Sequence, residues 1–304
     1  MDGKVKLGII ANLDKPLAGE MLARAAAHAA KRGIAVVANA APPSAPARDW
    51  KVVGDLSAGF DGVSAILVLG GDGTLLNAIR AVGPGAAPFL GVNIGTLGYL
   101  SAVEGSRIEE AIDAAAAGEI DISRRLMLAA EAAAATPATP ARRAFPARAL
   151  NEVVLYRSTG RVAHLSLFLD GIQVTNYSCD GVIVSTPTGS TAYSLSAGGP
   201  LVMPMADVLV ITVICPHALS TRPIIVSGST RVELRSQPGN ASLSLAIDGA
   251  DVGAISPGET LSGAAALERA SIAFLKGHDD FEILARKLGW KGFAGNPQRK
   301  GATS

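Results

Sequence analysis

Short apolar runs alternate with longer amphipathic stretches over the first hundred residues of the chain. Residues 5–11, 34–38 and 65–69 are largely apolar runs of the length expected for strands covered on both faces. Between the first two runs, apolar residues recur at helical spacing from Pro16, and Gly33 suits the position at which a helix ends. Strands that alternate with helices are typical of βαβ units, so this pattern predicts a parallel sheet.

The pattern changes after about Ser123. Before this point, residues 88–94 predict one more strand and residues 108–117 one more helix. Residues 132–148 are rich in Ala, Pro and Arg without a sustained period, and we interpret them as a surface connection. Short β-type runs then follow one another without helices between them, which indicates an antiparallel sheet or sandwich. The strands expected there are residues 151–156, 162–169, 181–185, 208–214, 223–226, 231–234, 242–247 and 271–274.

Helical spacing returns near the end of the chain, over residues 279–288. The chain has 304 residues, whereas single hydrophobic cores usually stop growing near about 250, so two domains are expected. The predicted organisation is an α/β domain over residues 1–123, an antiparallel β domain over residues 124–277, and a C-terminal helix and tail over residues 278–304.

The composition fits a globular protein with no general affinity for polyanions. Hydrophobic residues make up 49% of the chain and charged residues 17%, which supports buried cores and argues against disorder. The 27 basic and 26 acidic side chains leave a formal charge of +1, so no nucleic-acid partner is expected. The amino end lacks the features of a secretory signal, and no window approaches about 20 uninterrupted apolar residues. We therefore expect a cytoplasmic protein with no membrane span.

The two cysteines, Cys179 and Cys215, are too few for a disulfide framework. Their spacing is not typical of a zinc site or a redox centre. We expect both to be reduced and buried, with a single bridge between them as the alternative.

A glycine-rich turn joins a predicted strand directly to a predicted helix. Residues 67–74 read Leu-Val-Leu-Gly-Gly-Asp-Gly-Thr, and apolar residues then continue at helical spacing. Glycines allow backbone N–H groups to approach a ligand, and a helix N-terminus favours negative charge. We therefore expect a phosphate site here, and we count Gly71, Gly73 and Thr74 among the nucleotide-binding residues.

Asp72 is the unusual member of this turn, because a carboxylate among phosphate-binding amides repels the ligand. It can hold a magnesium ion, or it can act on a proton. A general base here could accept the proton of a hydroxyl group that attacks a terminal phosphate. The alternative is that Asp72 only caps the following helix.

A second stretch, residues 180–200, runs from a short apolar strand into a loop rich in hydroxyl groups and glycine. Small hydroxyl side chains and the flat face of Tyr193 suit a base and a ribose. The alternative is an ordinary turn, because Ser and Thr are common in turns. The hydroxyl residues are Thr188, Ser190, Thr191, Ser194 and Ser196.

Three further positions are weaker candidates. Asn93 opens the segment Asn-Ile-Gly-Thr-Leu-Gly at the end of a predicted parallel strand, where open α/β sheets bind ligands, so we expect a pocket wall there. His164 and His217 are first of all expected to be packed or hydrogen-bonded residues. The position of His164 also makes it a candidate to line a binding pocket.

Several motifs together resemble the NAD kinase family in its bacterial form. They are the Gly-Gly-Asp-Gly-Thr turn at residues 70–74, Asn151-Glu152, the run Thr-Pro-Thr-Gly-Ser-Thr-Ala-Tyr at residues 186–193, Pro216-His217 and Arg222-Pro223. They occur in the family's order, and the resemblance extends from Val5 to about Trp290. The run at 186–193 is the most specific part, because lipid kinases and phosphofructokinases share the glycine-aspartate turn.

The resemblance implies a Rossmann-like first domain, a β-sandwich second domain and a closing helix that returns to the first domain. It implies an enzyme that transfers the terminal phosphate of ATP to the 2′-hydroxyl of the adenosine ribose of NAD, which gives NADP. By position, Asp72 matches the catalytic aspartate, with Gly73 beside the phosphates. The implied cofactor is Mg²⁺ or another divalent cation, with no protein residue assigned to it, and the implied assembly is a homodimer or homotetramer.

The same resemblance implies a dinucleotide site made by residues of the second domain. Asn151 and Glu152 match the pair that contacts the dinucleotide, mainly through ribose hydroxyls and amide-type groups. Asp180, Thr191, Ala192, Tyr193 and Ser196 match further residues of that pocket, and we also count His164, Thr188 and Asp248 among the expected binding residues. Ser178 and Cys179 depart from the family pattern, since many members carry a basic residue there, and Ala250 stands where many carry glutamine.

Two other functions share parts of these motifs. A lipid or sphingoid kinase could use the same glycine-aspartate turn, but it has no use for Asn151-Glu152 or for the run at residues 186–193. A non-catalytic sensor of NADP could keep the fold, and the intact Asp72 argues against it.

Overall fold

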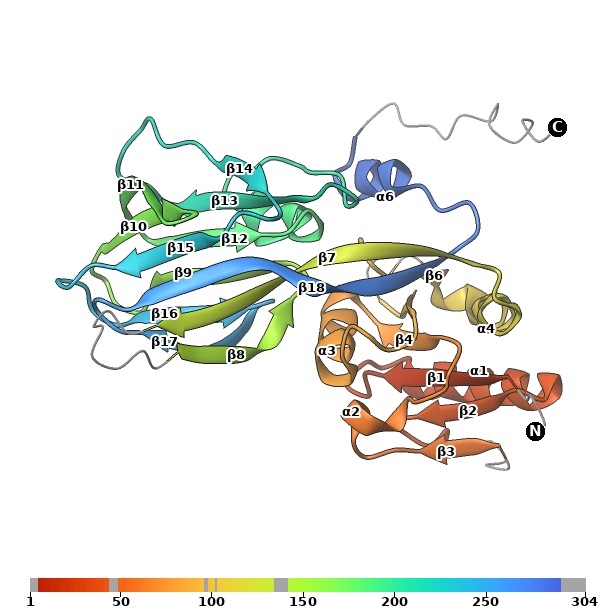
Figure 1. The fold of residues 1–304 in the computed structure, drawn as a ribbon. Helices are drawn as coiled ribbons and strands as arrows, with labels where there is room; N and C mark the ends of the chain where they lie inside the picture. Colours follow the sequence, from red (N-terminus) through yellow and green to blue (C-terminus); the bar gives the residue numbers. More distant parts are fainter. Residues whose placement is uncertain (1–4, 44–48, 96–97, 102, 134–141, 291–304) are drawn as a thin grey trace. The chain divides into compact units, whose positions relative to one another are not determined.

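The computed structural model describes residues 5–43, 49–95, 98–101, 103–133 and 142–290. It divides into two compact units (Figure 1). Unit 1 comprises residues 1–123 and 271–304, and unit 2 comprises residues 124–270. Two long strands, β7 (Ile120–Ala133) and β18 (Thr260–Leu275), each contribute residues to both units.

Unit 1 contains the predicted parallel sheet. Its strands follow the order β3-β2-β1-β4-β5-β18, and β6 also pairs with β5 in parallel. The strands are β1 (Lys6–Ala11), β2 (Ala35–Ala38), β3 (Trp50–Val52), β4 (Ile66–Gly70), β5 (Phe89–Asn93) and β6 (Val103–Glu104). The helices are α1 (Ala18–Arg32), α2 (Leu56–Gly59), α3 (Asp72–Val82), the 3₁₀ turn η1 (Gly105–Arg107), α4 (Ile108–Ala117) and α6 (Asp280–Lys287).

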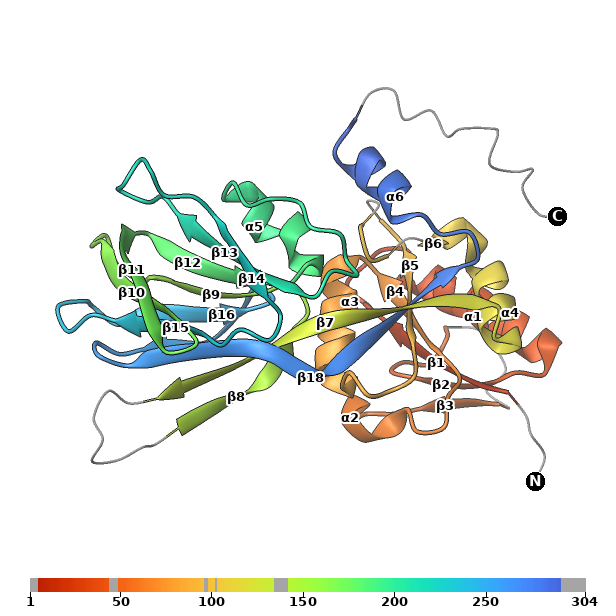
Figure 2. The ribbon, with the colours of Figure 1, turned by 45° about the horizontal axis from the view of Figure 1, so that its top comes forward.

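Helices cover both faces of this sheet. Leu7 and Ile9 of β1 lie in one core cluster with the buried residues of α1 and α4, and the two helices lie side by side (Figures 1 and 2). On the opposite face, a Cβ added at Gly8 would lie 2.7 Å from the ring of Phe60, the residue that follows α2. Gly33 ends α1 in the left-handed conformation (φ 66°), as expected for a helix stop. The prediction of a Rossmann-like α/β fold is therefore confirmed.

Unit 2 consists of two antiparallel sheets packed on a shared core. One belongs to a 12-stranded sheet that also contains the parallel strands of unit 1, and its part in unit 2 has the order β11-β10-β15-β18-β7-β8. The other has six strands in the order β14-β13-β12-β9-β16-β17. A single hydrophobic cluster contains Leu165 and Leu234 from the first sheet and Leu155 and Val184 from the second, which is the arrangement of a sandwich. The first sheet adds β8 (Arg142–Ala149), β10 (Ala163–Leu169), β11 (Ile172–Cys179) and β15 (Val232–Ser236). The second contains β9 (Glu152–Arg157), β12 (Gly181–Ser185), β13 (Val208–Ile214), β14 (Ile224–Ser227), β16 (Leu243–Ile247) and β17 (Ala250–Ile255), and two short elements, η2 (Thr188–Thr191) and α5 (Tyr193–Ser196), follow β12.

The interpretation of residues 132–148 as an irregular connection was wrong for the described residues of this range. Ala132 and Ala133 end β7, and residues 142–148 belong to β8, which pairs with β7 in antiparallel register. Residues 134–141 lie outside the described residues. The alanine-rich composition hid these strands, because β-structure depends more on a pairing partner than on intrinsic propensity. The same reason explains why β11, β17 and the first half of β18 were not predicted.

Both cysteines are free, but the expectation that both are buried was wrong. Cys179 is fully buried at the end of β11, and burial raises the pKa of its thiol to about 12. Cys215 is exposed, because it follows the last residue of β13 in a left-handed conformation (φ 46°) that takes the chain out of the sheet. Among the described residues, no helix has both the length and the apolar character needed to span a membrane.

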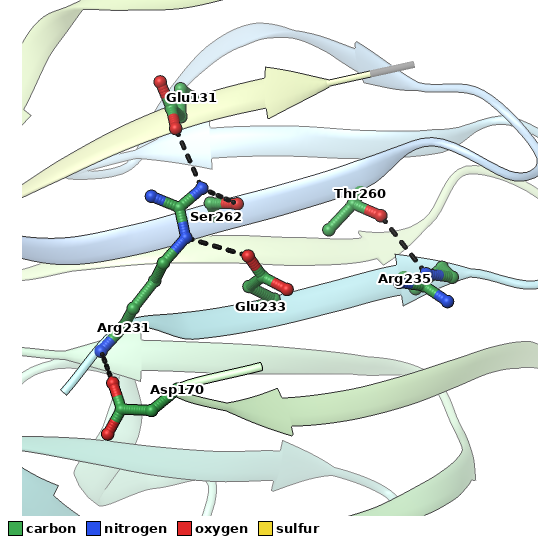
Figure 3. A network of polar contacts seen from close by, with 7 residues as sticks. All are labelled: Glu131, Asp170, Arg231, Glu233, Arg235, Thr260 and Ser262. Carbon is green, nitrogen blue, oxygen red and sulfur yellow. Dashed lines mark hydrogen bonds and ion pairs between the residues drawn. The ribbon is translucent and has the colours of Figure 1, made fainter. Parts of the chain in front are cut away.

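A polar network centred on Arg231 joins three strands of the first sheet of unit 2 (Figure 3). The guanidinium donates to Glu233 of β15 at 2.8 Å, and to Glu131 of β7 and Ser262 of β18 at 2.9 Å each. Its backbone N–H donates to Asp170 at 2.9 Å. The side chain is 41% exposed, so solvent screens each ion pair.

We predict that Arg231→Met lowers the free energy of unfolding by roughly 1 kcal/mol, the value typical of two partly exposed ion pairs. The matched control is Arg235→Met, because Arg235 bonds Thr260 and lies 4.4 Å from the centroid of the Phe168 ring instead of pairing with two carboxylates. Urea unfolding at low salt and at 1 M NaCl measures both variants. The loss of unfolding free energy in Arg231→Met should be smaller at 1 M NaCl than at low salt. A loss that does not depend on salt would contradict an electrostatic role for Arg231.

Candidate functional site

The glycine turn of unit 1 leaves its backbone open at the start of α3. Gly71 is the N-cap residue, and a Cβ added at Gly71 or Gly73 would meet no atom within 4 Å. Gly70 is different, because an added Cβ would lie 2.3 Å from Oγ1 of Thr74. That hydroxyl also accepts a bond from Asn12 at 3.3 Å, so Thr74 packs within the turn. The first N–H groups of a helix have no partner inside it, so Gly71 and Gly73 border a site suited to phosphate.

The carboxylate of Asp72 holds a different segment of the chain. Its Oδ2 accepts the N–H of Tyr99 at 2.7 Å, and its Oδ1 accepts those of Leu100 and Ser101 at 3.0 Å each. Gly98 lies directly against this carboxylate, since an added Cβ would be 2.0 Å from Oδ1. The structure therefore shows Asp72 fixing the loop after β5, and not capping α3.

Asn93 ends β5 and is buried. Its Oδ1 accepts the N–H of Gly95 at 2.7 Å. It lines a cavity of about 370 Å³ together with Met21, Ile94 and Gly105. This cavity lies at the carboxyl end of a central parallel strand, which is the edge at which α/β sheets bind ligands.

In unit 2, the structure brings together two motifs that are far apart in the sequence. The N–H of Thr186 donates to the carbonyl of Asn151 at 2.9 Å. Gly189 packs on the same residue so closely that an added Cβ would lie 2.1 Å from the Asn151 oxygen. The Asn151-Glu152 pair and the run at residues 186–193 therefore form one cluster.

Asp248 shapes this cluster from the turn between β16 and β17. Its carboxylate accepts the N–H groups of Leu150, Asn151 and Glu152 at 2.8, 2.7 and 3.1 Å. Its own backbone is left-handed (φ 47°), and its N–H donates to the carbonyl of Glu152 at 3.0 Å. The described side-chain bonds of Asp248 therefore go to the main chain of the cluster.

Glu152 is a buried carboxyl group, only 5% exposed. Burial, reinforced by the negative charge of Asp248, raises its pKa to about 8, and a hydrogen bond from the N–H of Tyr193 opposes this shift. Its Oε2 has no hydrogen-bond partner among the described residues, and the same holds for Oγ1 of Thr188, which is 2% exposed. Buried polar atoms are rarely left unsatisfied, so these two atoms point to a ligand that supplies hydrogen bonds.

The other predicted residues of the 186–200 stretch lie nearer the surface. The side chain of Thr191 donates to the carbonyl of Thr188 at 3.1 Å. Ala192 is partly buried, whereas Tyr193 is 46% exposed and Ser196 is exposed. The ring of Tyr193 is thus available for stacking, next to the backbone that bonds Glu152.

Asp180 and His164 form pairs of their own. Asp180 makes a bidentate ion pair with Arg157, with Nε–Oδ1 at 2.8 Å and Nη2–Oδ2 at 3.1 Å. His164 is exposed, and its Nδ1 lies 3.0 Å from Oγ of Ser178 on the neighbouring strand β11. Among the described residues, the side chain of Asp180 thus pairs with Arg157, and that of His164 lies within hydrogen-bond distance of Ser178.

Sequence reasoning missed the residues that support the site through distant contacts. Arg157, which pairs with Asp180, was not singled out, and neither was Lys287 of α6, whose Nζ lies 3.8 Å from Oδ2 of Asp72. No local motif marks either residue. Their contacts with Asp180 and Asp72 arise only in the folded chain.

The comparisons with known proteins agree on one family. A model of the ATP-NAD kinase N-terminal domain matches residues 7–120, and a model of the ATP-NAD kinase C-terminal domain matches residues 150–272. The chain is 34% identical to the NAD kinase of Moorella thermoacetica over 284 residues, which cover 93% of this chain and 89% of that protein. It is 38% identical to the NAD kinase of Gemmatimonas aurantiaca, over 77% of this chain and 80% of that protein.

Two solved structures share the fold. The crystal structure of yeast NADH kinase complexed with NADH has a TM-score of 0.84 at 23% identity, and the match covers 95% of this chain and 89% of that one. The crystal structure of an NAD kinase from Archaeoglobus fulgidus in complex with ATP has a TM-score of 0.72 at 21% identity, over 94% and 99% of the two chains.

We predict that the protonation of Glu152 makes stability depend on pH. Its pKa is about 8 in the folded protein against an ordinary value of 4.5. At a pH between these two pKa values, Glu152 is protonated more often in the folded protein than in the unfolded chain. Stability therefore falls as pH rises, by at most about 1.4 kcal/mol per pH unit, and levels off above about 8.

Glu152→Gln removes this dependence, because an amide cannot ionise. Relative to the wild type, the variant should gain stability steadily from pH 5 to pH 8 in urea unfolding experiments. Glu119→Gln, at an exposed position, is the control and should leave the wild-type slope unchanged. Parallel curves for the wild type and Glu152→Gln would show that Glu152 does not titrate in this range.

Proposed function

This chain belongs to the NAD kinase family, and we propose that it transfers the terminal phosphate of ATP to the 2′-hydroxyl of the adenosine ribose of NAD, giving NADP. The observation that carries the proposal is the turn at Gly71–Gly73, where open backbone at a helix N-terminus adjoins the carboxylate of Asp72. Phosphoryl transfer needs this combination, since the phosphates require N–H donors and the attacking hydroxyl requires a base.

The donor phosphates are assigned to the turn that begins α3. Gly71 and Gly73 leave room for an oxygen to approach their main chain, and Thr74 stabilises the turn through its contact with Gly70. The Archaeoglobus fulgidus kinase, which shares this fold, was crystallised in complex with ATP. Mg²⁺ is usually bound largely through substrate phosphates, so the ATP phosphates would be its main ligands here, where it would offset their charge, and no residue of the chain is assigned to it.

Asp72 is assigned as the general base. Oδ1 accepts two main-chain bonds and Oδ2 only one, so Oδ2 retains a lone pair for a substrate proton. As the 2′-oxygen of NAD attacks the terminal phosphorus, its proton passes to Oδ2. The bond from that phosphorus to the oxygen bridging the β- and γ-phosphates then breaks, and ADP leaves. The three amide bonds keep the carboxylate in one orientation throughout.

The dinucleotide is assigned to the cluster of unit 2. Hydroxyl groups of a ribose fit the unsatisfied Oε2 of Glu152 and Oγ1 of Thr188, because a hydroxyl both donates and accepts. The exposed ring of Tyr193 offers a stacking face for adenine, and Asn151 adds an amide group. The other assigned contacts in unit 2 are His164, Asp180, Thr191, Ala192 and Ser196. In unit 1, Asn93 is assigned to a wall of the nucleotide pocket.

Asp248 is assigned a supporting part in this site, because its carboxylate orients the main chain of Asn151 and Glu152. A homodimer or homotetramer and a cytoplasmic location are further proposals that rest on the family resemblance.

We predict that Asp72→Asn abolishes NADP formation, with a loss of kcat of at least about 10³-fold, while NAD and ATP still bind. A coupled assay for NADP and calorimetric binding measurements test this. Gly98→Ala is the matched control, because its methyl group disturbs the same contact between Asp72 and residues 99–101 but keeps the carboxylate. If both variants lost activity equally, Asp72 would act only by holding the loop.

We predict that Gly71→Ala weakens binding of the donor phosphates but leaves the stability of the fold nearly unchanged. The backbone at Gly71 (φ −109°, ψ −170°) suits any residue and a Cβ meets no atom, so the free energy of unfolding should change by no more than about 1 kcal/mol. The methyl group occupies the space assigned to the donor, so KM for ATP should rise at least about tenfold.

Gly70→Ala is the contrasting variant, since its methyl group would collide with Thr74 and should destabilise the fold. An unchanged KM for ATP in Gly71→Ala would place the donor elsewhere.

A further inference from the structure

The C-terminal helix α6 brings a cation to the proposed base. Nζ of Lys287 lies 3.8 Å from Oδ2 of Asp72 and 5.8 Å from the centroid of the Tyr99 ring. The side chain of Lys287 is 36% exposed and that of Asp72 is 27% exposed, so a ligand from solvent can reach both. All three residues belong to unit 1.

The position of Lys287 is set by how α6 is anchored. At the start of the helix, Asp279 accepts the N–H of Phe281 at 2.8 Å. The ring of His278 stacks on Phe274 of β18 with centroids 3.5 Å apart, and its Nε2 lies 3.0 Å from Oδ1 of Asp280. Leu284 is buried in the middle of α6. The helix is therefore held to the strand before it, and its last residue is Lys287.

Asp72 by itself does not account for this cation. Its carboxylate already accepts three main-chain N–H groups, and 3.8 Å is longer than a hydrogen bond. An ammonium group has three donors, and the nearby N-terminus of α3 already favours an anion. The preceding cation, Arg286, pairs instead with Glu282 at 3.2 Å along the surface of α6. Of the two cations that end this helix, one faces the phosphate turn.

We propose that Lys287 is a catalytic residue of this kinase, whose ammonium group binds the terminal phosphoryl group of the donor during transfer. The proposal rests on the function proposed above and extends the donor site to α6. In the absence of donor, Lys287 pairs with Asp72. With donor bound, the ammonium donates to oxygens of the transferring group and offsets the charge there, and it moves no proton.

Three variants test the role of the charge. Lys287→Met should lower kcat for NADP formation about 10²-fold, as loss of one donor to a transition-state charge does, while KM for NAD stays within about twofold. Lys287→Arg should restore most of the rate, because it retains a cation. Arg286→Gln is the matched control on the same helix turn and should behave like the wild type. Full activity of Lys287→Met would overturn the proposal.

A second measurement tests whether Lys287 binds the donor phosphate directly or only positions Asp72. ATP binding is measured by calorimetry for Asp72→Asn and for Asp72→Asn combined with Lys287→Met, since the first change already removes the ion pair. A further loss of at least about tenfold in ATP affinity is expected. Equal affinities would mean that Lys287 acts only through Asp72, and would overturn the proposal. This result does not depend on turnover, so it stands even if the wild type makes no NADP, which would refute the proposed function itself.

Discussion

Backbone N–H groups that leave a sheet still need acceptors when they are buried, and two carboxylates meet this constraint at the candidate site. Asp72 accepts the N–H groups of residues 99–101, and Asp248 accepts those of residues 150–152. Asp72 fixes three consecutive residues outside regular structure, and Asp248 fixes the two residues before β9 together with its first residue, Glu152. The shape of both parts of the candidate site depends on these bonds, because residues 99–101 and 150–151 lie outside helices and strands.

The same bonds set the electrostatics around them. Asp248 keeps a negative charge close to the buried Glu152 and contributes to the raised pKa of that carboxyl group. A neutral Glu152 near pH 7 can donate as well as accept, which widens the choice of ligand hydroxyl groups that fit. In the other unit, the amide bonds hold Asp72 in one orientation, while Lys287 from the end of α6 supplies the nearby positive charge. In both candidate clusters, distant parts of the chain thus position the charges.

Glycine positions in the site divide by what surrounds them. At Gly70, Gly98 and Gly189 a side chain would collide with Thr74, Asp72 or Asn151, so these glycines serve close packing. At Gly71 and Gly73 an added Cβ would meet no atom within 4 Å, so packing does not require glycine there, whereas the proposed donor site would. A glycine-rich motif therefore contains two kinds of position, which only the surrounding structure distinguishes.

Local patterns in the sequence were sufficient for much of this protein. Alternating apolar runs and amphipathic stretches predicted the parallel sheet, and the motifs at residues 70–74, 151–152 and 186–193 indicated the family that the comparisons confirm. The spacing of apolar residues and the sequence motifs are properties of neighbouring residues, so both can be recognised without knowledge of the fold. The alanine-rich strands β7, β8 and β18 exist because partner strands accept their hydrogen bonds, and β18 pairs with β5 and β7, which lie far away in the sequence. Tertiary structure alone likewise decided that Asp248 supports Glu152 and that Lys287 faces Asp72, since such contacts leave no local signal.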